Sequence, residues 1–165
     1  MTTRPEPAAV RAAVVADAHG ITRVHHTAWR ETYTRLLPEG ALDVLDEDAF
    51  ATRWASIIDD DVTSVHVAER GGEIVGWCSA SAGRDEDRPR DAELEGIYVL
   101  ASEYGTGTGQ ALLDAAIADR PAYLWVADDN PRARAFYARN GFHPDGVNDV
   151  HHLLGHPLPA VRLVR

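Results

Sequence analysis

The sequence predicts a mixed, layered α/β fold, in which helices cover a central sheet with both antiparallel and parallel strands. An alternating stretch at 62–69 and an apolar stretch at 74–81 flank Gly71 and Gly72, as expected of two strands joined by a hairpin turn. Farther along the chain, an apolar strand, an amphipathic helix and a second apolar strand follow one another, which is the order of a parallel crossover unit. Hairpin and crossover in one chain predict a layered α/β domain.

The amino-terminal third predicts one strand and two helical regions. After a Pro-containing segment that we expect to be a flexible tail over residues 1–7, residues 10–16 are apolar enough for a short strand. Asp17 is a suitable N-cap for a helix that extends to Arg35, because apolar residues recur there at helical spacing. Pro38 breaks this helix, and the second helical region that follows ends at three consecutive aspartates.

The remaining elements have boundaries marked by glycine, proline or asparagine. They are a polar loop at 83–91, a strand at 94–100, a helix that begins at the glycines of 105–109, a strand at 122–127, a helix between Asn130 and Gly141, and two short strands near 142–147 and 160–164. The complete order predicts a mixed central sheet of about seven strands flanked by about four helices.

Length and charge limit the classes of protein to consider. At 165 residues, the chain is long enough for one hydrophobic core and too short for two ordinary domains, so we expect a single domain over residues 1–165. Its 16 basic and 26 acidic residues give a formal net charge of −10, which disfavours nucleic acid and anionic membrane as partners. Acidic runs are usually solvated loops, although they could also attract a cationic acceptor such as a polyamine.

Three features of the sequence indicate a cellular compartment. No apolar stretch approaches the roughly 18 residues that span a bilayer, and the amino terminus lacks the hydrophobic run of a signal peptide. Cys78 is the single cysteine and cannot form an internal disulfide. These features predict a soluble, cytoplasmic protein.

The strongest local signal is the segment 94–113, LEGIYVLASEYGTGTGQALL, in which an apolar strand leads through alternating glycines directly into a helix. Glycines let the backbone approach a ligand, and the free N–H groups of a helix start favour an anion such as a pyrophosphate. A Walker A loop is disfavoured because no lysine follows the glycines. A dinucleotide-binding loop would explain Asp128 and Asp129 downstream, but Gln110 or Leu112 stands where its last glycine belongs.

A second segment, 124–142, has the sequence LWVADDNPRARAFYARNGF. Together with the glycine loop, it resembles the GNAT (GCN5-related) N-acetyltransferase superfamily. That family's pyrophosphate loop has Gln or Arg, two residues, Gly, one residue, and Gly or Ala. Gly107 and Gly109 match this pattern, whereas Tyr104 replaces the Gln or Arg. AWRETYTRLLP near the amino terminus and LPAVRLVR at the carboxyl terminus extend the resemblance over nearly the whole chain.

The resemblance implies an acyl-CoA-dependent N-acyltransferase with a splay between the two parallel central strands. Such an enzyme transfers the acetyl group of its cosubstrate acetyl-CoA to a primary amine of a small-molecule acceptor, by direct attack in a ternary complex. The alternative is a GNAT-like module that binds acetyl-CoA as a sensor or regulator without turnover. Dimers are common among similar proteins and among soluble oligomers, so a homodimer is one assembly to expect.

The resemblance also implies roles for individual residues. Tyr137 matches a tyrosine near the thioester sulfur, where a phenol can protonate the departing thiolate. Glu93 matches a catalytic glutamate, and Glu95 shares its face of the strand, so either is a candidate base. Trp29 and Tyr33 match positions that wall the acceptor pocket. The implied cofactor-binding residues are Ile97, Tyr98, Val99, Tyr104, Gly105, Thr106, Gly107, Thr108, Gly109, Gln110, Asn130, Ala133 and Phe136.

Structural roles compete with several of these assignments. Asn130 is also a satisfactory N-cap, Trp29 is also a suitable core residue, and a salt bridge would explain either glutamate equally well. His151, His152 and His156 lie without a cysteine or a carboxylate at ligand spacing. We therefore expect no metal site.

Overall fold

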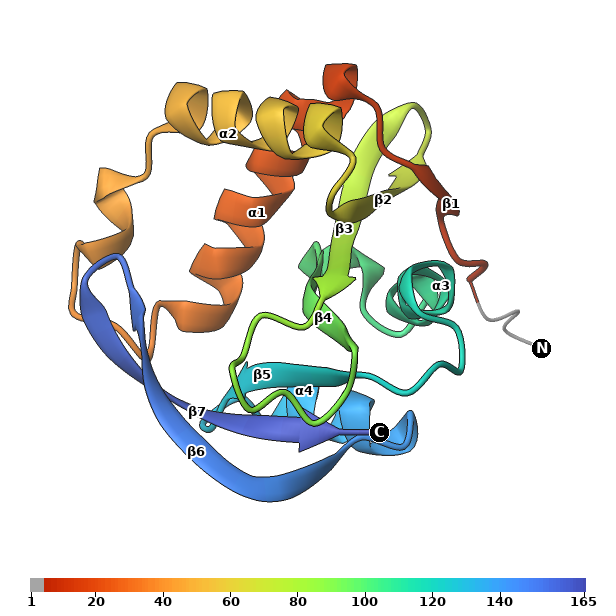
Figure 1. The fold of residues 1–165 in the computed structure, drawn as a ribbon. Helices are drawn as coiled ribbons and strands as arrows, with labels where there is room; N and C mark the ends of the chain where they lie inside the picture. Colours follow the sequence, from red (N-terminus) through yellow and green to blue (C-terminus); the bar gives the residue numbers. More distant parts are fainter. Residues whose placement is uncertain (1–4) are drawn as a thin grey trace.

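A single seven-stranded sheet organises the protein, in the strand order β1-β2-β3-β4-β5-β7-β6. The computed structural model describes residues 5–165, and Figure 1 shows their arrangement. The strands are β1 (Ala9–Ala12), β2 (Ser64–Arg70), β3 (Glu73–Ala82), β4 (Ala92–Val99), β5 (Tyr123–Ala127), β6 (His143–Leu153) and β7 (His156–Val164). Neighbouring strands are antiparallel except β4 and β5, which are parallel, so the predicted mixed sheet is confirmed.

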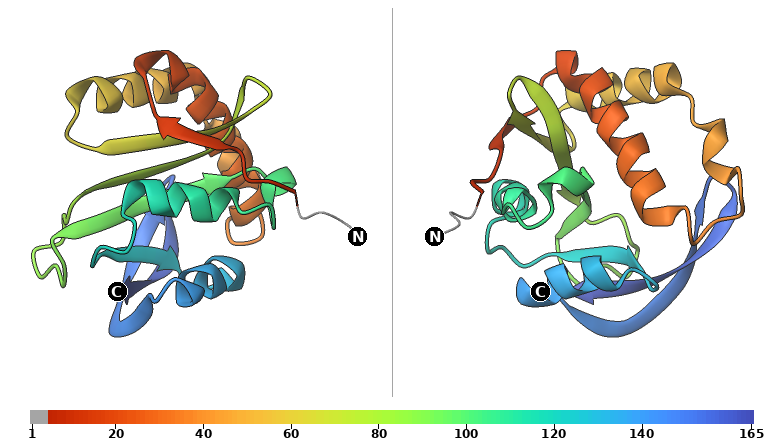
Figure 2. Two further views of the ribbon diagram at one scale, coloured as in Figure 1. Left: turned by 90° about the vertical axis from the view of Figure 1, so that its right-hand side faces the viewer. Right: turned by 180° about the vertical axis from the view of Figure 1, so that it is seen from behind.

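Two pairs of helices cover the two faces of the sheet. The helices are α1 (Ala18–Tyr33), α2 (Glu47–Asp60), α3 (Thr108–Ala116) and α4 (Pro131–Arg139), with short 3-10 turns η1 (Val15–Asp17), η2 (Ala41–Val44) and η3 (Ala101–Glu103). Figures 1 and 2 show α1 and α2 on one face and α3 and α4 on the other. The α/β layering predicted from the order of elements is therefore present.

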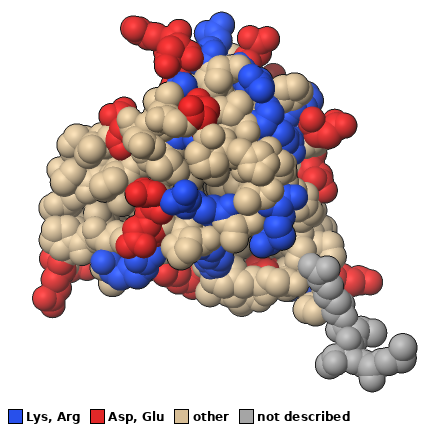
Figure 3. Space-filling view, turned by 90° about the horizontal axis from the view of Figure 1, so that it is seen from below, with Lys and Arg blue, Asp and Glu red and all other residues tan. Residues whose placement is uncertain are grey.

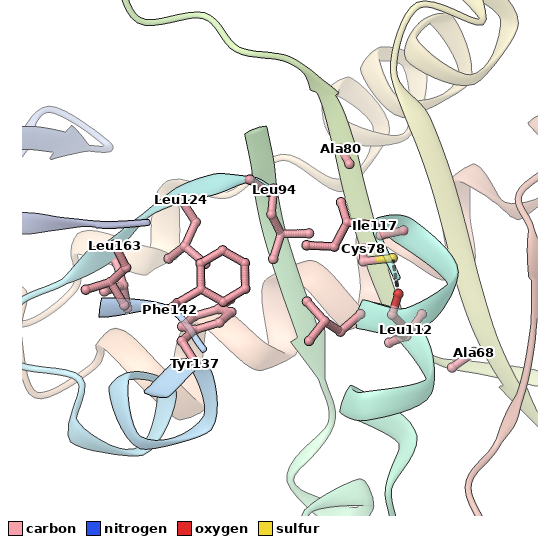
Figure 4. Close-up of a cluster of buried hydrophobic side chains, with 14 of the residues drawn as sticks. Ala68, Cys78, Ala80, Leu94, Leu112, Ile117, Leu124, Tyr137, Phe142 and Leu163 are labelled. Carbon is pink, nitrogen blue, oxygen red and sulfur yellow. Dashed lines mark hydrogen bonds between the residues drawn. The ribbon is translucent and has the colours of Figure 1, made fainter. Parts of the chain in front are cut away.

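The core follows the alternation of side chains along the strands. On β3, Trp77 packs with α1 and α2, whereas Cys78 belongs to the cluster beneath α3 and α4. Figure 4 shows this second cluster, in which Cys78 Sγ donates a hydrogen bond of 3.3 Å to the carbonyl of Leu112. Burial raises the pKa of the Cys78 thiol to about 12, so the thiol stays protonated at neutral pH.

The two parallel strands diverge almost at once. β4 and β5 are paired only at Glu93 and Tyr123, and beyond that point each strand continues with its outer neighbour alone. The predicted splay between the central strands is therefore present. It separates the sheet into a half formed by β1 to β4 and a half formed by β5 to β7.

Three details of the sequence prediction are wrong. The strand expected at 10–16 ends at Ala12, because the chain turns into η1. Asp17 does not cap α1 with its side chain, since its carboxylate accepts hydrogen bonds from Arg11 and from the Val14 N–H instead. β6 and β7 are much longer than the strands expected near 142–147 and 160–164. Most of β6 is exposed and carries little of the alternation that marks a strand, and β7 begins with two prolines among its first four residues.

The amino-terminal segment contacts the body of the protein where the structure describes it. Residues 1–4 of the expected flexible tail lie outside the described residues. The Glu6 carbonyl accepts a hydrogen bond from Arg70, and the Ala8 N–H donates one to Thr108. Between residues 5 and 165, no helix is both long and apolar enough to cross a membrane.

Candidate active site

A cavity of about 550 Å³ opens where β4 and β5 diverge. Its walls come from α1, the end of β4, the glycine-rich loop and α4. Most of the residues that the sequence implied for the cofactor line it, and Tyr137 lies among them. These residues are Ile97, Tyr98, Val99, Tyr104, Gly105, Gly107, Gly109, Gln110, Asn130, Ala133 and Phe136. The fold therefore brings the two motif segments together around one cavity.

The end of β4 offers unpaired backbone to this cavity. The Leu100 N–H donates to the Val75 carbonyl of β3. Because backbone groups of successive residues point to opposite edges of a strand, the N–H and C=O of Val99 point away from β3, toward the divergence. An extended ligand can form strand-like hydrogen bonds there.

The glycine-rich loop presents N–H groups at the start of α3. Gly107 occupies the N-cap with φ of 96°, a left-handed conformation that favours glycine. Within residues 5–165, no acceptor is found for the N–H groups of Gly105, Gly107, Gly109 and Gln110. Unpaired donors at the positive end of a helix dipole form a site for an anion.

Thr106 and Thr108 of the same loop do not line the cavity. They are buried beneath it, and their hydroxyls contact each other at 2.8 Å and contact the Glu103 carboxylate at 3.2 and 2.8 Å. Glu103 also accepts two hydrogen bonds from Arg70, which lower the pKa of its carboxyl to about 2. This network fixes the loop from below, and the sequence analysis missed Arg70 and Glu103 because they are 33 residues apart.

The cavity also contains basic side chains that the sequence analysis did not select. Every one of the 16 basic residues of the chain is arginine, and Arg132 and Arg139 of α4 line the cavity. Figure 3 shows several arginines close together on the face that carries α4 and β6. A local basic surface on a chain of net charge −10 is suited to an anionic ligand.

Helix α4 begins as the sequence predicts. The Asn130 side chain accepts a hydrogen bond of 3.2 Å from the Ala133 N–H, which confirms its N-cap role. Asn130 and Ala133 also line the cavity, so capping and ligand contact are compatible. A Cβ atom added at Gly109 would lie 3.7 Å from the Phe136 ring, so the loop and α4 are in close contact.

Tyr137 brings a phenol to the cavity from α4. The residue is buried, and Figure 4 shows its ring beside Phe142. Within residues 5–165, no hydrogen-bond partner is found for its hydroxyl. Burial raises the pKa of Tyr137 well above its usual value, so the phenol is protonated at neutral pH and able to donate.

The two glutamates of β4 differ in their surroundings. Glu93 is 3% exposed and accepts hydrogen bonds from the Arg84 guanidinium, the Arg84 N–H and the Tyr123 hydroxyl. Burial alone would raise the pKa of Glu93, but these bonds outweigh it and hold the pKa below its usual range. Glu95 accepts from the hydroxyls of Ser79 and Ser81, and its side chain is 19% exposed.

The α1 face carries the two residues expected to contact the acceptor. Tyr33 is buried, and its hydroxyl lies 2.9 Å from that of Tyr98, which lines the cavity. Trp29 packs edge-on against His25 at a centroid distance of 4.3 Å. Burial lowers the pKa of His25 to about 3, so this imidazole is neutral. Neither Trp29 nor Tyr33 lines the cavity itself.

The histidines near the carboxyl terminus lie on strands β6 and β7. His151 packs against Trp125 with a centroid distance of 4.8 Å. Over residues 5–165, no group of three or more histidine, cysteine, aspartate or glutamate side chains has a geometry that could hold a metal ion.

The comparisons with known proteins identify the class as an acyl-CoA-dependent N-acyltransferase. A model of the acetyltransferase (GNAT) family matches residues 22–142. The chain is 28% identical over 148 residues to "Probable N-acetyltransferase Rv2775" of Mycobacterium tuberculosis, covering 87% of this chain and 84% of that protein. It is 31% identical over 129 residues to the uncharacterized N-acetyltransferase YuaI of Bacillus subtilis, covering 74% of this chain and 73% of that protein. The chain therefore belongs to the GNAT family.

A solved structure shares the fold. A phosphinothricin acetyltransferase from Sinorhizobium meliloti, solved in complex with acetyl-CoA, superposes with a TM-score of 0.67. The match covers 96% of this chain and 87% of that one at 23% identity. The splayed seven-stranded sheet is thus the arrangement of a GNAT domain.

Proposed function

We propose that this protein transfers the acetyl group of acetyl-CoA to a primary amine of a small molecule, by direct attack in a ternary complex. One observation carries the proposal: a single cavity contains both the unpaired N–H groups at the start of α3 and the unpaired hydroxyl of Tyr137. The first group fits a pyrophosphate and the second fits a thiolate, and a CoA thioester has these two groups at opposite ends of its pantetheine arm.

The cofactor would follow the end of β4. Ile97 and Val99 would provide backbone groups to the pantetheine arm as a missing neighbouring strand would, whereas the N–H and C=O of Tyr98 point toward β3 and the residue would line the arm in other ways. The pyrophosphate would lie on the N–H groups of residues 105–110, with Asn130, Ala133 and Phe136 along the other side. Thr106 and Thr108 would act from beneath, by holding the loop in this conformation.

The reaction then needs two proton transfers. The nitrogen of the neutral amine attacks the thioester carbonyl carbon, and the negative charge that develops on the carbonyl oxygen is stabilised by the Val99 N–H. The carbon–sulfur bond breaks, and the departing thiolate takes the phenol proton of Tyr137. The proton lost by the attacking nitrogen leaves on the opposite face of β4, where Glu93 and Glu95 lie.

Glu95 is the better candidate for the base. Its carboxylate is partly exposed, so a water molecule can connect it to the amine. Arg84 lies 3.7 Å from the Glu95 carboxylate but makes its short hydrogen bonds with Glu93, which would need to break those bonds and the one from Tyr123 first. Trp29 and Tyr33 would limit the acceptor from the α1 side.

Thermal unfolding with and without acetyl-CoA tests the cofactor, with NAD and ATP as comparison ligands. A ligand raises the unfolding temperature only if it binds the folded state preferentially, so acetyl-CoA alone should stabilise the protein. Thiol release is then measured with a panel of small amines. Stabilisation with amine-dependent thiol release supports the enzyme, stabilisation without release from any amine supports the sensor, and no stabilisation contradicts the cofactor site.

A further inference from the structure

The guanidinium of an α4 arginine lies over the aromatic ring of Tyr104 in the glycine-rich loop. The guanidinium carbon of Arg132 is 3.6 Å from the centroid of the Tyr104 ring. Both residues line the cavity, beside the loop whose N–H groups at Gly105 and Gly107 are unpaired. The stacked pair therefore joins α4 to the loop at the anion-binding end of the cavity.

Arg132 forms no salt bridge with the described part of the chain. Within residues 5–165, no carboxylate lies within 4.0 Å of its guanidinium nitrogens. Glu31 is the acidic group that influences it from nearby, and that carboxylate accepts a hydrogen bond from the Ala101 N–H. Arg132 is exposed overall, but the protein around its guanidinium removes part of its hydration, and this desolvation lowers its pKa against the opposing effect of Glu31. A guanidinium in such a position has donors available for a ligand.

Stacking on the ring leaves the N–H donors of Arg132 available, because they point outward in the plane of the guanidinium. A cation on an aromatic face is attracted by the ring and loses rotational freedom before any ligand binds. Its N–H groups still point outward from the edge, where they can bind two oxygens of a phosphate. The Tyr104 ring thus orients Arg132 without occupying its hydrogen-bonding groups.

We propose that Arg132 is a side-chain cation that binds the pyrophosphate of acetyl-CoA in this protein, and that Tyr104 is a positioning residue that orients it by stacking. The inference rests on the proposed function, because it assumes that acetyl-CoA occupies the cavity. Arg132 adds charge to a loop that otherwise offers only backbone N–H groups.

The test compares ligands that differ in their phosphates. Arg132→Gln should weaken the binding of acetyl-CoA about 10-fold, as expected for the loss of one charge-assisted contact of about 1.4 kcal/mol. The turnover of S-acetylpantetheine, which has no phosphate, should stay within about twofold of wild type. The loss should persist with acetyl-dephospho-CoA, which keeps the pyrophosphate and lacks the 3′-phosphate.

Arg134→Gln is the matched control on the same helix. Arg134 pairs with Asp128 and does not line the cavity, so acetyl-CoA binding should not change. Tyr104→Leu should weaken acetyl-CoA binding by a smaller factor and leave S-acetylpantetheine turnover unchanged.

Three outcomes would overturn the inference while leaving the proposed function intact. They are wild-type affinity of Arg132→Gln for acetyl-CoA, an equal loss with S-acetylpantetheine, and a loss that disappears with acetyl-dephospho-CoA. Failure of the wild-type protein to bind acetyl-CoA would overturn both the inference and the proposed function.

Discussion

Tyr137 and the two glutamates lie on opposite faces of β4. Tyr137 packs in the cluster beneath α3 and α4, together with Leu94. Side chains alternate along a strand, so Glu93 and Glu95, on either side of Leu94, point to the α1 face. A thioester that lies in the divergence between β4 and β5 would therefore meet a proton donor on one side and a proton acceptor on the other. The two substrates can approach each other from opposite faces of the sheet.

Removal of the Tyr137 hydroxyl should slow chemistry without preventing cofactor binding. Tyr137→Phe keeps the ring that packs against Phe142 and loses the group that protonates the thiolate. We expect kcat to fall about 100-fold, at the lower end of the contribution of a general acid. Steady-state thiol release gives kcat, and calorimetry should give an unchanged affinity for acetyl-CoA. Unchanged turnover of Tyr137→Phe at every pH tested would exclude the phenol as the proton donor.

The two glutamates form a matched pair of substitutions. Glu95→Gln should lower kcat at neutral pH, because an amide cannot accept the amine proton, and activity should recover at higher pH as the free amine becomes more abundant. Glu93→Gln should instead reduce the free energy of unfolding by about 1–3 kcal/mol, because the buried partner groups lose hydrogen bonds. pH-rate profiles and urea unfolding of both variants separate the roles. A larger kinetic effect in Glu93→Gln than in Glu95→Gln would reverse the assignment.

The resemblance of two short segments to the GNAT superfamily was sufficient to find one part of the site. The glycines of the loop and Tyr137 lie within these two short segments, so the resemblance predicted most of the residues that line the cavity. The surroundings of Glu93 depend on Arg84 and on Tyr123, which is 30 residues away, and pairings at such separations leave no periodic signal. Arg132 was missed for the same reason, since its contact with Tyr104 depends on how the loop meets α4.

At the scale of elements, the glycine-rich loop depends on the ion pair beneath it. Arg70 of β2 and Glu103 of η3 hold the hydroxyls of Thr106 and Thr108. These bonds lower the pKa of the Glu103 carboxyl from its ordinary 4.5 to about 2. A carboxyl whose pKa is lower in the folded than in the unfolded state stabilises the folded state at pH values above the unfolded pKa. This contribution to stability is lost as the pH falls toward the folded pKa.

Glu103→Gln should therefore reduce stability in a pH-dependent way. We expect a loss of about 1–3 kcal/mol in the free energy of unfolding at pH 7, because Arg70 and the two threonines lose a charged acceptor. The difference from wild type should shrink as pH falls from about 4.5 toward about 2, because the wild-type carboxyl becomes protonated. Urea unfolding at several pH values measures this difference. The control is Glu73→Gln at an exposed position, which should show no such trend with pH. A difference in the free energy of unfolding between Glu103→Gln and wild type that stays constant with pH would contradict the assigned pKa.

Elements were predicted well where burial imposes a pattern and less well where it does not. β3 and β5 are buried on both faces and read clearly as apolar strands. β6 lies at the edge of the sheet with most residues exposed, so its composition does not mark it as a strand. Pairing with β7 determines its length instead, with eight residue pairs interrupted by one irregularity.

At the scale of the whole molecule, the divergence that opens the cavity also weakens the sheet. The two halves share one residue pair, Glu93 with Tyr123. The loop at 83–91 compensates, because it lies across the junction and bonds to both halves. On the side of the first half, its Arg84 donates to the Glu93 carboxylate of β4. On the side of the second half, the Asp85 carboxylate accepts from Trp125 of β5 and from Arg162 of β7. The site thus depends on side-chain contacts where strand pairing ends.

Arg162 is the residue on which this junction depends most. It is 4% exposed and contacts three carboxylates, Asp85 at 3.2 Å, Asp87 at 3.0 Å and Asp145 at 2.8 Å. Arg162→Met keeps an unbranched, flexible side chain and removes its charge, which leaves the carboxylates without a shared partner. We expect the free energy of unfolding to fall by about 3 kcal/mol, the lower end for a broken buried pair.

Arg35→Gln is the comparison that separates this junction from an ordinary ion pair. Arg35 also binds an aspartate, Asp129 at 2.8 Å, but the two side chains are 55% and 71% exposed. Its loss should cost less than about 1 kcal/mol, because solvent screens an exposed pair. Amide hydrogen exchange should further show faster opening of β5 and β7 in Arg162→Met, with β2 and β3 less affected. Equal effects of the two substitutions, or exchange that rises evenly across the sheet, would mean that strand pairing and the core alone hold the two halves together.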